Sequence, residues 1–543
     1  MKADYCFKST AVFTAKTQKT IEGCVLISGE HILDVVPFGS EGLYIGKNTR
    51  IVDCGHKLVM PGFIDAHTHF FSGALANSEH VCETIVKSTS EEECVQMMLI
   101  YAKSHPNEKR LRGRGWFVTN WGDAPLPTKR SLDRVFPDIP VYMQAADCHS
   151  YWLNSAALIE CGITKETTVE SGYIGRFDSG ELDGMLVELE ACNYADKMYR
   201  LFTADEKKEI YKSFLNKIAK NGITSMSEMI PDEYNEENHE NYQIIKNIEN
   251  EEALSVRLHI FPKLYDCTNY KQASALKEEF DSEWMRIAGL KGFIDGVVET
   301  YTGLLLEPYT DRPETCGIGV PVKSQEELNS CVTEANREGF PVRIHCIADG
   351  SVHMALDAFE ASVKVNGKGL ANTIEHIENI HPDDLKRFRK LGVLPSVQPI
   401  HLLLDANGKI NRIGQERIRY EWPFQSLLHE TGGLAIGTDY PVVDINPFDN
   451  IYAAVTRKFF DGSLAGFNPE QKLTMGQTLL GYTKYAAHAY SRQQDLGMLE
   501  KGKLADLIVI DHNLFETPEE DIRSSKVIMT MSGGRIIYDR NHT

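Results

Sequence analysis

Eight short runs rich in β-branched residues recur through the middle of the chain, and helical patterns such as SQEELNSCVTEANREG and PDDLKRFRKLG separate several of them. Alternation of strands with helices predicts βα units and a parallel sheet. Eight is also the number of parallel strands that closes a barrel. The sequence therefore predicts an α/β protein with a (β/α)8 barrel built from VMPGFIDAHTH, GITSMSEM, VRLHIF, RIAGLKGFIDG, FPVRIHCIAD, NTIEHI, VLPSVQP and LAIGTDYP.

Additional segments flank and interrupt this series. About 150 residues separate the first two predicted strands, and a connection that long must carry structure of its own. We therefore expect residues 71–220 to form an inserted subdomain near the barrel mouth, with the barrel in 59–70 plus 221–489. Both ends of the chain are β-rich and too short to bury a core alone. We expect 1–58 and 490–543 to pair into one composite β domain.

Composition excludes several classes of protein. The formal net charge is −20, whereas phosphate binding needs clustered Lys and Arg, so nucleic acid is excluded as a partner. No stretch approaches the ~18 consecutive apolar residues of a membrane span. The N-terminal run MKADYCFKSTAVFTAKTQKT alternates and lacks the apolar core of a secretory signal. The twelve cysteines form no CxxC pair, so their spacing fits neither a zinc ribbon nor a small disulfide framework. We therefore expect reduced thiols. We expect a cytoplasmic protein.

Ligand-type side chains end several of the predicted strands. His67 and His69 lie in the run DAHTH, and side chains two apart in a strand point the same way, so both imidazoles can reach one ion. A lone HxH motif is weak evidence for a metal site, because such a motif often occurs for packing reasons. His345 ends PVRIH, His376 ends NTIEH and Asp439 ends LAIGTD. Such barrels carry their chemistry at these strand ends, and imidazoles with a carboxylate suit Zn²⁺ or a similar divalent ion.

Lys291 is the less obvious candidate. It lies in GLKGFIDG, on the predicted fourth strand, between apolar neighbours. Burial lowers the proton affinity of a lysine, and a neutral amine can react with carbon dioxide to give a carbamate that bridges two metals. From spacing alone, an ordinary surface or ion-paired lysine is the favoured interpretation.

Taken together, the HxH pair, the strand-four lysine, the histidines of strands five and six and the strand-eight aspartate resemble the binuclear amidohydrolase superfamily. More narrowly, the chain resembles the amidohydrolase 3 branch, which includes N-substituted formamide deformylases. The matching stretches cover nearly the whole chain: PGFIDAHTH, RGWFVTNW, VYMQAADCHSYWLNSAAL, LKGFIDG, HCIADGSV, IEHIENI, SVQP, GTDYPV and LEKGKLADLIVID. One departure is Gly350, where the branch usually has an arginine after the aspartate.

The resemblance implies a distorted (β/α)8 TIM barrel with a small β-sandwich domain formed by both termini. It also implies one or two divalent metal ions, with Zn²⁺ favoured, and hydrolysis of a non-peptide C–N bond in a small-molecule substrate. His67, His69 and Asp439 would hold one ion, His345 and His376 the other, and carbamylated Lys291 would bridge them.

In the implied mechanism a metal-bound hydroxide attacks an amide or formamide-type carbonyl. Asp439 acts as general base and then general acid, and His345 helps to polarise the carbonyl. An alternative is a mononuclear aminohydrolase that deaminates a nucleobase-like ring without a bridging lysine. A third is a non-catalytic barrel, although none of the expected ligands is missing here.

Further residues are weaker candidates. Trp121 and His149 match positions of the branch that face the pocket, while Gln398 and Tyr440 lie near strand ends, so all four are candidate substrate contacts. For Trp121, aromatic core and capping contacts are an equally good interpretation. Asp295 and Glu375 would orient ligand imidazoles or make ordinary turn contacts. We interpret the remaining loop histidines as surface or core residues; these are His353, His381, His401 and His429. A homodimer is the candidate assembly, and the substrate cannot be named from sequence.

Overall fold

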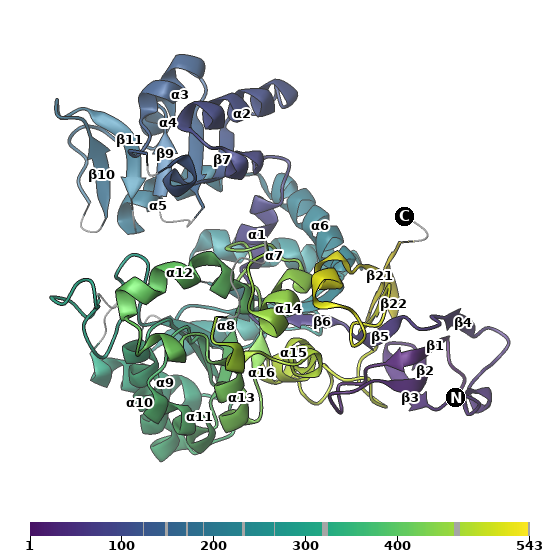
Figure 1. Cartoon of the computed structure of the whole chain (residues 1–543). Coiled ribbons are helices and arrows are strands. Elements are labelled where there is room, and N and C mark those ends of the chain that lie inside the picture. The colour runs from purple at the N-terminus through teal and green to yellow at the C-terminus, as the bar shows by residue number, and fades with distance from the viewer. Residues whose placement is uncertain are drawn as a thin grey trace. The chain divides into compact units, whose positions relative to one another are not determined.

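A computed structural model describes the chain except for residues 123, 147–149, 170–171, 188, 231–233, 265, 318–323, 461–466 and 541–543, and the side chains of 119, 189, 404, 405, 407 and 408. The chain divides into two compact units (Figure 1). The first combines Met1–Phe70 with Leu215–Thr543, and the second is Phe71–Phe214.

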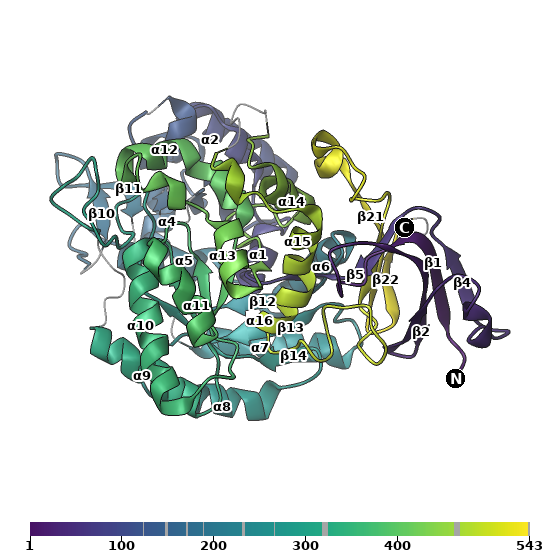
Figure 2. The same ribbon diagram turned by 60° about the horizontal axis from the view of Figure 1, so that its bottom comes forward.

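Strands from both ends of the chain share one sheet in the first unit, where they lie side by side in Figure 2. Its order is β22-β21-β20-β5-β1-β2-β3, and β4 also pairs with β1. A core that includes Phe7, Val25, Leu507 and Met531 covers one face. The strands are β1 (Tyr5–Val12), β2 (Ile21–Ser28), β3 (His31–Val36), β4 (Arg50–Asp53), β5 (Leu58–Pro61), β20 (Leu507–Ile510), β21 (Val527–Ser532) and β22 (Arg535–Asp539).

Two parallel sheets form the centre of the first unit. One has the order β14-β13-β12-β6 and the other β15-β16-β17-β18-β19. The amide of Ala66 donates to Ile436 O at 3.1 Å on one side, and that of Lys291 donates to Pro262 O at 2.8 Å on the other. The arrangement is a TIM-barrel-like α/β fold with β6 (Phe63–Asp65), β12 (Ile223–Met229), β13 (Arg257–Phe261), β14 (Met285–Ile287), β15 (Leu290–Phe293), β16 (Val342–Cys346), β17 (Thr373–His376), β18 (Leu394–Val397) and β19 (Ala435–Ile436).

Helices follow these strands and surround the parallel sheets (Figure 2). Several begin with side-chain caps; Ser324, for example, forms a capping box with Glu327 at the start of α9, which satisfies two otherwise unpaired amides. Among the described residues, no helix is long and apolar enough to cross a membrane. The helices are α7 (Glu236–Asn250), α8 (Asn269–Phe280), α9 (Gln325–Arg337), α10 (Asp349–Asn366), α11 (Leu385–Leu391), α12 (Leu402–Ile413), α13 (Phe424–Thr431), α14 (Pro447–Thr456), α15 (Met475–Leu480) and α16 (Ala486–Ala489).

Two of the eight predicted runs are each divided between two strands. The run VMPGFIDAHTH contains β5, which is antiparallel to β20 in the terminal sheet, and β6, which is parallel to β12. Gly62 lies between them, at the crossing from one sheet to the other. The run RIAGLKGFIDG is interrupted at Ala288 and Gly289, so the predicted fourth strand consists of β14 followed by β15.

The second unit has its own sheet, with the order β10-β11-β9-β8-β7. Trp116, Trp121 and Trp152 lie in its core. Its strands are β7 (Leu111–Trp116), β8 (Val141–Ala145), β9 (Ser150–Leu153), β10 (Tyr173–Arg176) and β11 (Leu182–Val187). Its helices are α1 (Phe70–Ala76), α2 (Glu91–Ser104), α3 (Lys129–Val135), α4 (Ser155–Glu160), α5 (Leu189–Tyr199) and α6 (Ala204–Lys220), of which α1 and α6 cross the boundary with the first unit.

Candidate metal centre

The segments that follow β6 and β19 run side by side and carry three of the predicted ligands. The amide of Asp439 donates to His67 O at 2.7 Å, and that of His69 donates to Tyr440 O at 2.9 Å. A Cβ at Gly437 would lie 2.4 Å from the His67 nitrogen, so glycine permits this close approach. The two segments thereby hold both histidines against the aspartate.

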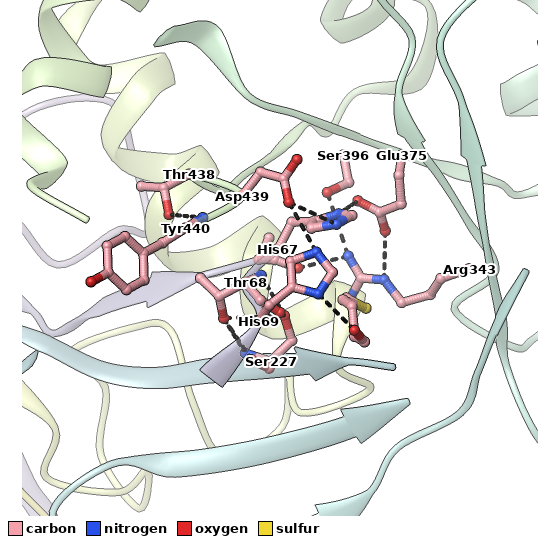
Figure 3. A network of polar contacts seen from close by, with 12 residues as sticks. His67, Thr68, His69, Ser227, Arg343, Glu375, Ser396, Thr438, Asp439 and Tyr440 are labelled. Carbon is pink, nitrogen blue, oxygen red and sulfur yellow. Dashed lines mark hydrogen bonds and ion pairs between the residues drawn. The ribbon is translucent and has the colours of Figure 1, made fainter. Parts of the chain in front are cut away.

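Imidazole and carboxylate atoms converge in this region (Figure 3). The Nε2 atoms of His67 and His69 lie 3.5 and 3.1 Å from Asp439 Oδ1. His67, His376 and Asp439 each offer a ligand atom, and these atoms all lie within 4.8 Å of one another. All three side chains are buried. The structure therefore brings together four of the six predicted ligands in one place.

Hydrogen bonds fix which nitrogen of each imidazole faces the aspartate. His67 Nδ1 lies 2.7 Å from Glu375 Oε2, and His69 Nδ1 lies 2.7 Å from Met229 O. A carboxylate and a carbonyl only accept hydrogen bonds, so each Nδ1 carries the proton. In the neutral rings, Nε2 then presents a lone pair toward the oxygen of Asp439. Lone pairs that face one another in this way favour a cation between them.

The electrostatics of the cluster also suit a cation. Burial lowers the pKa of His67 to about 4 and that of His376 well below its ordinary value. Burial alone would raise the pKa of Asp439, but its interactions with the imidazoles of His67, His69 and His376 hold it well below its ordinary range. Burial alone would lower the pKa of His69, but its contact with Asp439 and the negative charges of Asp439 and Glu228 together raise it. His376 Nδ1 has no hydrogen-bond partner among the described residues. Buried neutral imidazoles beside an ionised carboxylate fit a divalent metal ion.

The backbone departs from regular strand geometry at two of the ligands. Strand alternation would place Glu375 and His376 on opposite faces. His376 instead has a φ of 73°, and Asp439 has a φ of 63°. Non-glycine residues adopt this region at an energetic cost and cluster at functional sites. The turn at His376 lets both it and Glu375 reach the same cluster.

Lys291 lies in β15 and is completely buried. Its Nζ has no hydrogen-bond partner among the described residues and lies 5.0 Å from the centre of the Phe293 ring. Burial lowers its pKa to about 8, although the charges of Glu375 and Asp439 act in the opposite direction. The interpretation as an exposed lysine is therefore wrong. A buried lysine with a depressed pKa, close to a carboxylate cluster, is typical of a functional amine.

His345 is the last residue but one of β16, and its ring centre lies 4.4 Å from that of His376. Its Nε2 is 3.4 Å from Gly296 O, which makes Nδ1 the unprotonated nitrogen. Burial lowers the pKa of this imidazole to about 3. The Asp295 carboxylate, 3.8 Å from Nε2, accepts hydrogen bonds from the amides of Ile347 and Ala348. Asp295 therefore secures the loop that follows the strand.

Gly350, the departure from the family pattern, occupies a position with no room for a side chain. A Cβ there would lie 2.7 Å from Leu304 O and 3.0 Å from the carbonyl carbon of Leu305. The backbone around 304–305 thus occupies the space that an arginine side chain would need.

The four candidate substrate contacts have different placements, and substrate contact stays a prediction for each. Gln398 is 2% exposed, and its amide atoms have no hydrogen-bond partner among the described residues. The ring of Tyr440 points away from the imidazoles (Figure 3), with Lys217 Nζ 5.3 Å from its centre. Trp121 packs in the core of the second unit and donates to Ser88 O. His149 falls outside the described residues.

Two neighbours of the cluster were not assigned to it from the sequence. His401, interpreted as a surface or core histidine, is buried with Nε2 3.8 Å from Asp439 Oδ2. Its position three residues beyond Gln398 is a weak signal, because the distance from a strand end does not fix a side chain's direction. Arg343 is completely buried and contacts Glu375. Its place two residues before His345, on the same face of the strand, could have suggested it.

Comparisons with known proteins identify the family of the chain. A family model described as the Amidohydrolase family matches residues 50–538. Protein LONG AFTER FAR-RED 3 of Arabidopsis thaliana is 29% identical, over 99% of this chain and 92% of the relative. N-substituted formamide deformylase of Arthrobacter pascens is 25% identical, over 97% of each chain.

A solved structure is similar over nearly the whole chain. An uncharacterized metal-dependent hydrolase from Pyrococcus horikoshii has a TM-score of 0.77 and 25% identity, and the match covers 95% of this chain and 99% of that chain. The predicted resemblance to amidohydrolases is confirmed by the family match. The chain belongs to the Amidohydrolase family and is a metal-dependent hydrolase that acts on carbon–nitrogen bonds other than peptide bonds.

Proposed function

We propose that this amidohydrolase cleaves an amide or formamide-type bond of a small molecule with the help of two divalent cations, which we take to be zinc. The observation that carries the proposal is the convergence of ligand atoms from His67, His376 and Asp439 within 4.8 Å of one another. The formamide deformylase among the relatives supports the choice of bond. The substrate itself depends on loops whose specificity no motif records.

The donor set divides into two groups with one shared member. We propose that His67, His69 and Asp439 would hold one ion, that His345 and His376 would hold the other, and that carbamylated Lys291 would be the shared ligand. When bound, such ions supply a water that is acidic enough to attack near neutral pH and a Lewis acid for the substrate oxygen. The neutral state of His67, His345 and His376 supports this assignment, because only neutral imidazole coordinates a metal.

The chemistry of Lys291 supports the carbamate. With a pKa of about 8, about a tenth of the amine is neutral at pH 7, against roughly 0.03% for an ordinary lysine. The Nζ lone pair would attack the carbon of carbon dioxide, and the nitrogen would lose one proton to solvent. The product is a carbamate with one negative charge, and its oxygens offer a bridging ligand. A mononuclear deaminase needs no such lysine, so its burial here favours the binuclear hydrolase.

Asp439 is the proposed general base and general acid. Its carboxylate is held ionised, so it can take a proton from the attacking water and return it to the leaving nitrogen. The net reaction adds one water across the C–N bond and releases a carboxylic acid and an amine. His345, whose imidazole is neutral, would polarise the carbonyl oxygen through the ion that it is proposed to hold.

The finer architecture is part of the same proposal. We propose that the two parallel sheets form one distorted (β/α)8 barrel and that the eight-stranded sheet of both termini closes into a small β-sandwich. The backbone bonds that join β6 with β19 and β13 with β15 support the first statement. The inserted subdomain of residues 71–220, a homodimer and a cytoplasmic location stay predictions.

Metal analysis combined with a substrate screen tests the proposal. Purified protein should contain up to two zinc or manganese ions per chain, and a chelator should abolish its activity until metal is restored. Zinc- and manganese-loaded protein should be screened against N-formyl amines, N-acyl amines, ureas and cyclic amides, with release of the amine as the readout. Protein that binds no divalent metal, or metal-loaded protein that hydrolyses none of these classes, would show the proposal to be wrong.

A further inference from the structure

Arg343 has an unusual position for a charged residue. It lies in β16, is completely buried, and is paired in register with Lys291 on one side and Thr373 on the other. Its guanidinium lies over the rings of Phe261 and Tyr490, at 4.9 and 5.5 Å from their centres. A charge removed from water at this depth is costly unless it is paired and hydrogen-bonded. The hydrogen-bond partners of Arg343 therefore indicate why a charged residue occupies this buried position.

The guanidinium donates to groups on three neighbouring elements. Nε donates to Glu375 Oε1 at 2.5 Å, and Nη2 donates to Ala66 O at 2.8 Å and to Ser396 Oγ at 3.4 Å. These contacts join β16 to β17, to β18 and to the segment that follows β6 (Figure 3). One side chain thus spans strands that are far apart in the sequence.

Each of the two strongest contacts lies next to a candidate metal ligand. Ala66 precedes His67, so the bond to its carbonyl fixes the peptide that carries this histidine. Glu375 precedes His376, and its other carboxylate oxygen accepts a hydrogen bond from Nδ1–H of His67. His67 is therefore held at its backbone and at its imidazole through one guanidinium.

We propose that Arg343 is a positioning residue of the metal centre, which fixes His67 from both ends and sets the separation of the strands that carry His67, His345 and His376. The proposal rests on the metal-dependent function proposed above. A lysine cannot replace the arginine, because an ammonium lacks the planar fork that reaches two acceptors in fixed directions. The role is distinct from general support of the fold, because it predicts weaker metal binding and not only lower stability.

The test compares two matched substitutions of buried arginines. Arg343→Lys removes the planar guanidinium beside the candidate metal ligands. Arg257→Lys is the control, because Arg257 is equally buried and forms a similar fork with Asp506 at 2.9 and 3.2 Å, away from the ligands. The zinc dissociation constant is measured by competition with a chromogenic chelator, and the melting temperature of metal-free protein is measured in parallel.

Loss of an outer partner of a ligand weakens metal binding by about 10- to 100-fold. We expect a loss in that range for Arg343→Lys, partial recovery of kcat in excess zinc, and unchanged zinc affinity for Arg257→Lys although both variants melt earlier. If Arg343→Lys does not fold, the double variant Arg343→Gln/Glu375→Gln exchanges the ion pair for a neutral amide pair and should show the same loss of affinity.

Two outcomes would overturn the inference while leaving the proposed function intact. One is wild-type zinc affinity in Arg343→Lys or in the double variant. The other is an equal loss of affinity in Arg343→Lys and Arg257→Lys, which would assign Arg343 to general support of the fold. Absence of divalent metal binding by the wild-type protein would instead remove the proposed function, and this inference with it.

Discussion

Replacing Lys291 with methionine should make the metal-free protein more stable while it abolishes carbamate formation. In the folded chain burial lowers the pKa of this lysine to about 8, from an ordinary value of 10.5. Each pKa unit corresponds to about 1.36 kcal/mol, so the buried ammonium costs the folded state about 3 kcal/mol at neutral pH. Methionine has similar length and no charge, so the variant avoids this cost.

The sign of the pH dependence follows from the same shift. Between pH 8 and pH 10.5 the unfolded chain binds more protons at this lysine than the folded chain does, so this residue makes the protein more stable as the pH rises. Below about pH 8 the penalty is present in full, and above about pH 10.5 it is absent. The stability difference between Lys291→Met and the wild type should therefore be largest near neutral pH and should shrink across this window.

Urea unfolding of chelator-treated protein, followed by circular dichroism between pH 7 and pH 10.5, measures this difference. Lys291→Arg is the matched control, because it keeps the charge and should show no gain. Lys291→Met should also bind fewer metal ions and lose hydrolytic activity, a trade of function against stability. A Lys291→Met variant no more stable than the wild type at pH 7, or one with the same pH slope, would refute the reasoning.

Three further substitutions test other parts of the structure. Asp439→Asn should keep the circular dichroism spectrum and lower kcat by about 10²- to 10⁴-fold, as expected for a lost general acid and base; near-normal turnover would contradict its role. Burial raises the pKa of Glu421 from 4.5 to about 8, so its carboxyl group lowers stability as the pH rises through this range. The melting temperature of Glu421→Gln should therefore rise relative to the wild type between pH 5 and pH 9, and a constant difference would count against this. Gly350→Ala should cost about 1–3 kcal/mol of unfolding free energy, because its Cβ would lie 2.7 Å from Leu304 O, whereas Gly42→Ala, with no atom within 4 Å, should cost less; equal costs would disprove the steric argument.

The candidate ligands and their places near strand ends could be predicted from the sequence because they depend on local pattern. The period of two places His67 and His69 on one face, and apolar runs mark the strands that precede His345, His376 and Asp439. Each of these inferences uses residues within one short segment. The TIM-barrel-like fold follows from the same rhythm of strands and helices.

The partners that hold the ligands could not be predicted in this way. His67 and Glu375 are 308 residues apart, and Arg343 reaches Ala66 across 277 residues. Such contacts depend on which strands become neighbours and in which register, and local pattern does not contain that information. A buried Arg in a strand whose other residues, apart from His345, are apolar conflicts with simple patterning, and such conflicts concentrate at functional sites.

His376 shows why the strand pattern alone gives an incomplete site. A regular strand would direct either Glu375 or His376 toward the cluster, but not both. The positive φ at His376 costs on the order of 1–3 kcal/mol in a non-glycine residue, and it turns two consecutive side chains to the same side. One of them then fixes His67 through its Nδ1, and the other adds its own nitrogen to the ligand atoms. The positive φ therefore allows one strand end to bring two side chains to the candidate metal centre.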